Sequence, residues 1–227
     1  RERRARLVEA RLVFLLPRLV LNQVVRGRPS AESRRLLPIA VDGADHLDAA
    51  LAERRGLVLA SVHFGLPPLI RLVLEGRGAR VISVGASFIE GVDMAIGRDV
   101  WTRARALQRL RAEVEGGNVC VLLADVRGDR YIETPFLQAH IPVVPGAFVL
   151  ARATRSPLLP VFAVRAPGAW HFRVAFGPPL SLDDRARPAP FADIALSFAR
   201  CFEAIARDHP DHLFAYDPVF GASPGAP

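Results

Sequence analysis

The feature that most constrains the fold is a mostly apolar run of residues that ends at a histidine. Residues 57–62 have the length and composition of a buried β-strand, and His63 follows them directly. A helix is predicted over 45–55, and Pro67 and Pro68 suit the first turn of another helix. Helix, strand, histidine and helix in this order favour an open α/β fold with His63 at a ligand-binding edge of the sheet. The alternative is an ordinary loop or core histidine.

The same α/β rhythm continues along the chain. Further strands are predicted over 36–41, 79–84, 119–124, 158–165 and 170–176, and helices over 67–75, 99–115, 146–153 and 191–207. Residues 85–97 lack this rhythm and predict a loop over the site. No repeat or linker divides the chain, so residues 31–227 are predicted to form a single α/β domain with a mixed central sheet flanked by helices.

The first 30 residues have a different character. An apolar stretch over 12–21 is interrupted by Pro17 and Arg18 and has arginines on both sides, and its uninterrupted apolar runs are too short to span a bilayer. This pattern predicts an N-terminal amphipathic helix that lies at the head-group level of an anionic membrane. The alternative is an amphipathic helix that packs on the domain.

Charge and cysteine content narrow the classes of partner. The formal net charge is +7, and all 30 basic residues are arginines, whose guanidinium groups bind phosphate in a bidentate manner. Acidic partners are therefore expected, such as phospholipid head groups or an acidic carrier protein, whereas few aromatic residues and no nucleic-acid motif argue against nucleic acid. The two cysteines predict neither a disulfide framework nor a metal site.

A second polar group follows the predicted strand 119–124. Asp125 comes directly after it, with Arg127 close behind. If the strands are parallel, this edge is the one that carries His63. For Asp125, a catalytic role and a structural role, as a turn cap or a partner of Arg127, are equally open. The six histidines lack metal-ligand spacing, and a solvated cap is the simpler expectation for His209 and His212.

Three blocks of sequence follow one another along the chain. They are LPIAVDGADHLDAALAERRGLVLASVHFG at 37–65; LLAD at 122–125 with TPF at 134–136, PGAFVLARAT at 145–154 and PVF at 160–162; and HPDHLF at 209–214. Together they resemble the bacterial lipid A biosynthesis acyltransferases, the lauroyl and myristoyl transferases of the lysophospholipid acyltransferase superfamily. The resemblance covers about residues 36 to 220.

The resemblance implies transfer of a fatty acyl group from an acyl carrier protein or coenzyme A thioester to a lipid hydroxyl. The expected place is the cytoplasmic face of the bacterial inner membrane, and no cofactor or metal is expected. By position, His63 is the general base, Phe64 and Gly65 shape its turn, and Asp125 and Phe136 line or support the pocket. Arg127 is included among the candidate substrate-binding residues.

One departure from the family pattern concerns the catalytic motif itself. The family places Asp or Glu five positions after the histidine, and here Pro68 stands there. Proline can neither carry charge nor accept a side-chain hydrogen bond. In one interpretation another carboxylate replaces the missing one, with Asp125, Asp93 and Glu90 as candidates in that order. Otherwise the protein is a relative that binds lipid or acyl carrier protein without turnover.

Overall fold

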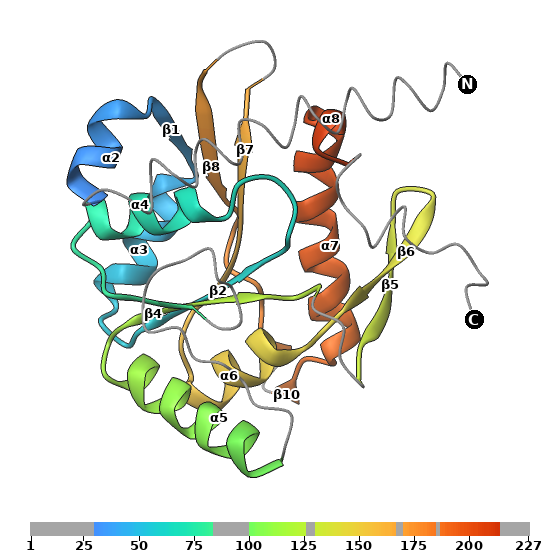
Figure 1. The fold of residues 1–227 in the computed structure, drawn as a ribbon. Helices are drawn as coiled ribbons and strands as arrows, with labels where there is room; N and C mark the ends of the chain where they lie inside the picture. Colours follow the sequence, from blue (N-terminus) through green and yellow to red (C-terminus); the bar gives the residue numbers. More distant parts are fainter. Residues whose placement is uncertain (1–29, 84–99, 126–129, 167–169, 185–186, 214–227) are drawn as a thin grey trace.

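The central sheet determines where every functional side chain stands. The computed structural model describes residues 30–83, 100–125, 130–166, 170–184 and 187–213 (Figure 1). In these residues the sheet has six strands in the order β1-β8-β7-β2-β4-β3. They are β1 (Ile39–Asp42), β2 (Leu57–Ser61), β3 (Val81–Ser83), β4 (Val119–Leu123), β7 (Leu158–Arg165) and β8 (Phe172–Phe176). Strands β7, β2, β4 and β3 are parallel, whereas β8 pairs antiparallel with β7 and parallel with β1.

The alternation of side chains along the central strands builds two separate cores. In β2, Val58 and Ala60 belong to one apolar cluster, whereas Leu57 and Leu59 belong to the other. All four side chains are buried, since successive residues of a strand point to opposite faces of the sheet and both faces are covered. This explains why the strand reads as a continuous apolar run rather than an alternating one.

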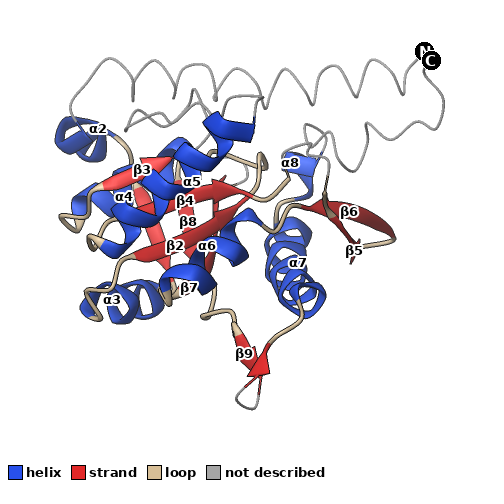
Figure 2. Cartoon of the chain, turned by 90° about the horizontal axis from the view of Figure 1, so that it is seen from below, coloured by secondary structure: helices blue, strands red, loops and turns tan. Residues whose placement is uncertain are grey.

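Helices cover both faces and give the domain three layers (Figure 2). One face carries α3 (Ala44–Ala52) and α4 (Pro68–Gly76), with α2 (Ser30–Leu36) against α4; the other carries α5 (Val100–Glu115), α6 (Gly146–Thr154) and α7 (Phe191–Asp208). The hairpin of β5 (Ile132–Phe136) and β6 (Ala139–Val143) packs on α7, and the short α8 (Pro210–Leu213) follows α7. A small hairpin, β9 (Asp183–Asp184) and β10 (Arg187–Pro188), precedes α7.

The predicted α/β domain with a mixed sheet is confirmed, with local differences. The segment predicted as a strand over 36–41 instead ends α2 and begins β1 only at Ile39. Helix α3 ends at Ala52 rather than at residue 55, because the backbone turns through positive φ at Arg54 (53°) and Gly56 (75°). The β5–β6 hairpin was not predicted.

Two predictions concern residues outside the described part of the chain. The N-terminal amphipathic helix predicted over 1–30 falls, apart from its last residue, in the part that is not described, and so does the loop predicted over 85–97. Within the described ranges, no helix combines the length and the apolar character needed to cross a bilayer.

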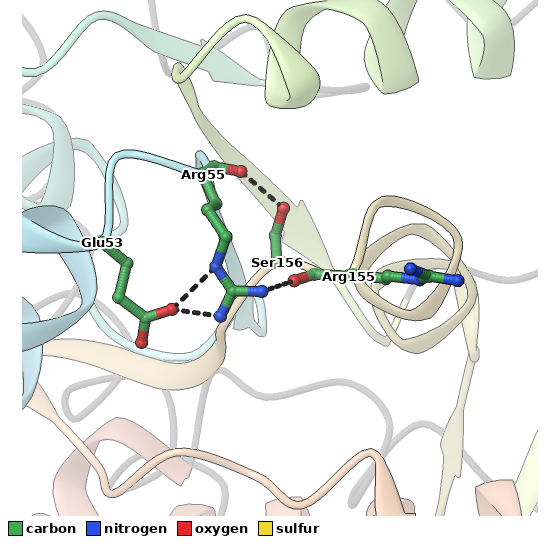
Figure 3. Close-up of polar contacts among 4 residues, drawn as sticks. All are labelled: Glu53, Arg55, Arg155 and Ser156. Carbon is green, nitrogen blue, oxygen red and sulfur yellow. Dashed lines mark hydrogen bonds and ion pairs between the residues drawn. The ribbon is translucent and has the colours of Figure 1, made fainter.

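A polar network ties the loops together where β2 and β7 begin (Figure 3). The Arg55 guanidinium donates to the Glu53 carboxylate and to the Arg155 carbonyl at 2.6 Å. The Ser156 hydroxyl donates to the Arg55 carbonyl at 2.8 Å. These contacts join the turn after α3 to the turn after α6, so they fix the amino edge of two neighbouring parallel strands.

Candidate active site

Strand register brings the two predicted site residues together at the carboxyl edge of the sheet. Strands β2 and β4 are parallel, and Ser61 pairs with Leu123 at the last position of each. The Ala124 N–H donates to the Ser61 carbonyl at 2.7 Å, so the pairing continues past both strands. Two residues beyond the strand ends, His63 stands opposite Asp125. The predicted common edge is therefore confirmed.

Two hydrogen bonds join His63 to the Asp125 carboxylate. The backbone N–H of His63 donates to Oδ2 at 2.8 Å, and ring Nδ1 lies 2.9 Å from Oδ1. An ionised carboxylate can only accept, so we assign the proton of the neutral ring to Nδ1. This tautomer leaves Nε2 with a lone pair, available to accept a proton from another molecule.

The two side chains differ sharply in exposure. The His63 side chain is 40% exposed, whereas that of Asp125 is 1% exposed. Burial of a carboxylate costs several kcal/mol unless hydrogen bonds compensate for the lost water, as the two bonds from His63 do here. A buried acceptor that orients a partly exposed imidazole is the geometry required of a general base and its orienting group. The bond from the backbone N–H alone would equally fit a turn cap.

The turn after His63 requires glycine at position 65. Gly65 has φ of 72°, and a Cβ atom there would lie 2.0 Å from the Ala163 carbonyl oxygen. The next N–H, of Leu66, donates to the same carbonyl at 2.6 Å. The chain that leaves His63 is thus held against β7 by its backbone, and any side chain at Gly65 would separate the two.

Aromatic side chains lie beneath this turn. The Phe64 ring is buried and meets Phe202 of α7 edge to face, with centroids 5.1 Å apart. Phe136 of the β5–β6 hairpin stacks on Phe202 at 4.5 Å. Phe64, predicted to shape the turn, and Phe136, predicted to line or support the pocket, therefore connect through Phe202, which no sequence motif singled out.

Pro68, which occupies the position of the missing family acid, has a structural role. Pro68 is buried and begins α4, where a residue without an N–H leaves no helix donor unsatisfied. Of the three candidate replacements, Glu90 and Asp93 lie outside the described residues, as does Arg127. Asp125 is the candidate that the structure describes, and it contacts His63.

The prediction of a solvated cap at His209 and His212 is wrong. The two side chains are buried, with 4% and 1% of each residue exposed. Burial lowers the pKa of both, that of His212 to about 4. The short polar segment that contains both histidines has no pattern that predicts burial. In the structure it packs against the end of β7, where His212 Nε2 accepts a hydrogen bond from the Arg165 N–H at 3.3 Å.

His209, Asp211 and His212 place potential ligand atoms within 4.8 Å of one another. The cluster is nevertheless a poor match to a cation site. The Arg165 N–H already points at His212 Nε2, and positive charge at Arg165 and Arg173 contributes to the lowered pKa values of the histidines.

The cysteines carry no comparable polar arrangement. Cys120 and Cys201 are free thiols. Cys120 lies inside β4, and burial raises its pKa to about 12. Its thiolate, the nucleophilic form, is therefore scarce at neutral pH, which supports its interpretation as a core residue.

A partly exposed histidine held by a buried carboxylate, at the carboxyl edge of an α/β sheet, defines the class of site in which a hydroxyl can be deprotonated. The chain belongs to the bacterial lipid A biosynthesis acyltransferase family, whose model matches residues 29–215. The resemblance found in the sequence is thereby confirmed. No curated protein matches the chain.

Proposed function

We propose that this protein is a membrane-associated O-acyltransferase. It moves a fatty acyl group from an acyl carrier protein or coenzyme A thioester to a hydroxyl of a lipid or glycolipid, of the lipid A type by family membership. The observation that carries the proposal is the 2.9 Å contact between His63 Nδ1 and the buried Asp125 carboxylate. It supplies the histidine and acid pair that the chain lacks in its linear motif.

The chemistry follows from the free nitrogen of His63. Nε2 takes the proton of the acceptor hydroxyl as the oxygen attacks the thioester carbonyl, and a tetrahedral intermediate forms. Asp125 stabilises the imidazolium through Nδ1. The carbon–sulfur bond then breaks, and the proton passes from Nε2 to the leaving thiolate. The products are an ester and a free thiol, and each proton is accounted for without a cofactor.

In this proposal Asp125 stands in for the acid that Pro68 displaces. The family motif supplies its acid from the start of the helix after the histidine, which is α4 here. In this chain the acid comes from the end of the neighbouring parallel strand, β4. Both positions border the same sheet edge, so a change of source leaves the role unchanged.

The proposed partners follow from the reaction and the charge. The acyl donor and the lipid acceptor meet at the cytoplasmic face of the bacterial inner membrane, where the arginine-rich chain has favourable electrostatics with anionic head groups. Arg127 is proposed to bind an anionic part of a substrate, and the aromatic residues near His63 to support the acyl chain.

A second candidate function rests on Pro68. A relative that has lost the motif acid could retain the scaffold and bind lipid or acyl carrier protein without turnover. This reading requires that the His63–Asp125 pair be only a structural contact. Activity measurements separate the two candidates.

The experiment measures transfer of labelled acyl groups, from acyl carrier protein and from coenzyme A, into a total lipid extract of the source cells. His63→Ala is expected to lower transfer by about 100-fold or more, because a general base is removed. His46→Ala, at a partly exposed histidine of α3, is the matched control and should retain activity. No product from the intact protein would favour the binding relative, whereas equal measurable rates for the intact protein and His63→Ala would refute His63 as the general base.

A further inference from the structure

His212 touches the residue next to the proposed base. Its ring lies against Phe64, with centroids 5.5 Å apart and a tilt of 47° between the rings. Phe202 packs on Phe64 as well, at 5.1 Å. Phe64 therefore has an aromatic neighbour from α7 and another from α8, and displacement of either would let its ring, and the backbone it shares with His63, shift.

The same histidine also holds the end of β7. The Arg165 N–H donates to His212 Nε2 at 3.3 Å. Two residues earlier on that strand, the Ala163 carbonyl accepts from Leu66, and Ala163 forms a parallel bridge with Gly65. The end of β7 is thus bonded to α8 at Arg165 and to the histidine turn at Ala163.

These contacts form a closed circuit next to His63. The circuit runs from Phe64 to His212, from His212 to Arg165, along β7 to Ala163, and back to the turn through Gly65 and Leu66. We propose that His212 is a positioning residue for acyl transfer, which holds the turn so that His63 stays aligned with Asp125. This inference rests on the function proposed above for His63.

The charge state of His212 suits this role. Burial lowers its pKa to about 4, whereas the charge of Asp211 and a hydrogen bond with the Arg165 backbone act in the opposite direction. At neutral pH the ring is therefore uncharged and keeps an acceptor lone pair at Nε2 for the Arg165 N–H. A protonated ring would instead have to donate from Nε2 to the Arg165 carbonyl, 3.4 Å away, and would place a charge against Phe64.

Three substitutions separate the two contacts of His212. His212→Ala removes both the ring against Phe64 and the acceptor for Arg165. His212→Phe keeps a ring without an acceptor, and His212→Gln keeps an acceptor without a ring. Leu47→Ala is the control, since Leu47 is fully buried in the other core and its truncation lowers stability without touching the site.

The first readout is kinetic. His212→Ala is expected to lower kcat for acyl transfer on the order of 10- to 100-fold with KM within about twofold, because misplacement of a catalytic group weakens the chemical step more than binding. The Phe and Gln variants should each recover part of the loss. If His212→Ala does not fold, these two variants carry the test, since they refill the space.

The second readout does not depend on activity. Ring ¹⁵N chemical shifts of His63, assigned by comparison with His63→Ala, report which nitrogen carries the proton. The Nδ1–H form should dominate in the intact protein, and the His212 variants should populate the Nε2–H form more. An unchanged His63 tautomer in the His212 variants, with kcat no lower than in Leu47→Ala, would overturn the proposal.

The two readouts also separate this inference from the proposed function. If the intact protein transfers no acyl group but the His212 variants still change the His63 tautomer, the positioning contact stands and the acyltransferase assignment fails. If transfer depends on His63 but neither readout responds to His212, the enzyme stands and the positioning role fails.

Discussion

The two ends of strand β2 carry polar networks of opposite character. At the amino edge, Arg55 bonds to Glu53 and to a backbone carbonyl, and the Glu53 side chain is 42% exposed (Figure 3). At the carboxyl edge, His63 bonds to an Asp125 side chain that is almost fully buried. Both networks join neighbouring parallel strands, yet only the second withdraws a carboxylate from water.

This difference in burial indicates which edge of the sheet carries the functional site. An exposed ion pair contributes about 0 to 1 kcal/mol to the free energy of unfolding. A small stabilisation of the two turns is therefore enough to explain the amino-edge network. Burial of a carboxylate lowers the free energy of unfolding by more than an exposed ion pair contributes, unless well-formed hydrogen bonds compensate for the lost water. Its retention beside a partly exposed imidazole is better explained by chemistry at that imidazole than by stability.

The largest expected effect concerns His63. His63→Ala should reduce acyl transfer by about 100-fold or more, because the general base is removed. The free energy of unfolding should fall by about 1–3 kcal/mol, because the buried Asp125 carboxylate keeps only the bond from the backbone N–H. Paired measurements of transfer rate and urea unfolding check this. A large loss of stability with little loss of activity would reverse the contrast between the edges.

Asp125→Asn should have the next largest effect. The amide keeps the shape but presents a donor to one of the two His63 N–H groups, which favours the other tautomer and removes stabilisation of the imidazolium. We expect transfer to fall on the order of 100-fold, and stability to fall by about 1–3 kcal/mol because a buried donor loses its acceptor. Steady-state kinetics and chemical unfolding of this variant test both parts. Wild-type kinetics would assign Asp125 to the turn alone.

The buried histidines predict a pH dependence of stability. His212 has a pKa of about 4 in the folded protein and an ordinary value of 6.5, so between these values the unfolded chain binds a proton that the folded protein does not. Stability should therefore fall as the pH is lowered from about 6.5 to 4, by up to about 3 kcal/mol. Unfolding of the intact protein and of His212→Gln across this range isolates the effect. Parallel curves for the two proteins would contradict it.

The smallest effect is expected at the amino edge. Glu53→Gln removes one charge from the Arg55 pair and should change the free energy of unfolding by less than about 1 kcal/mol, with no change in acyl transfer. Raising the salt concentration should narrow even that difference, since exposed charges are screened. A marked loss of transfer in this variant would mean that the two edges are coupled through β2.

The sequence predicted the central strands well and the peripheral elements poorly. Residues 57–62 and 119–124 are long apolar runs, and both faces of a central strand are buried, so the pattern survives without tertiary information. The β5–β6 hairpin has Pro135 in one strand and Pro142 in the other, and proline argues against a strand. Its pairing depends on contact with α7, which no local pattern contains.

The candidate site likewise contains residues that the local sequence could identify and residues that it could not. His63 and Asp125 could be selected because each directly follows a recognisable strand, and parallel strands share a carboxyl edge. His212 and Phe202 could not, because their relation to Phe64 arises from the packing of helices far along the chain. Burial of His212 runs against the polar character of its segment, so the tertiary contact decided its environment.

The pairing of His63 with Asp125 also sets an order of events during synthesis. The two residues are 62 positions apart, and the segment between them includes α4, β3 and α5. A ribosome therefore releases the histidine well before its carboxylate, and the pair forms only after β4 has docked in register beside β2. A nascent chain consequently has no His63–Asp125 pair before β4 has joined the central sheet.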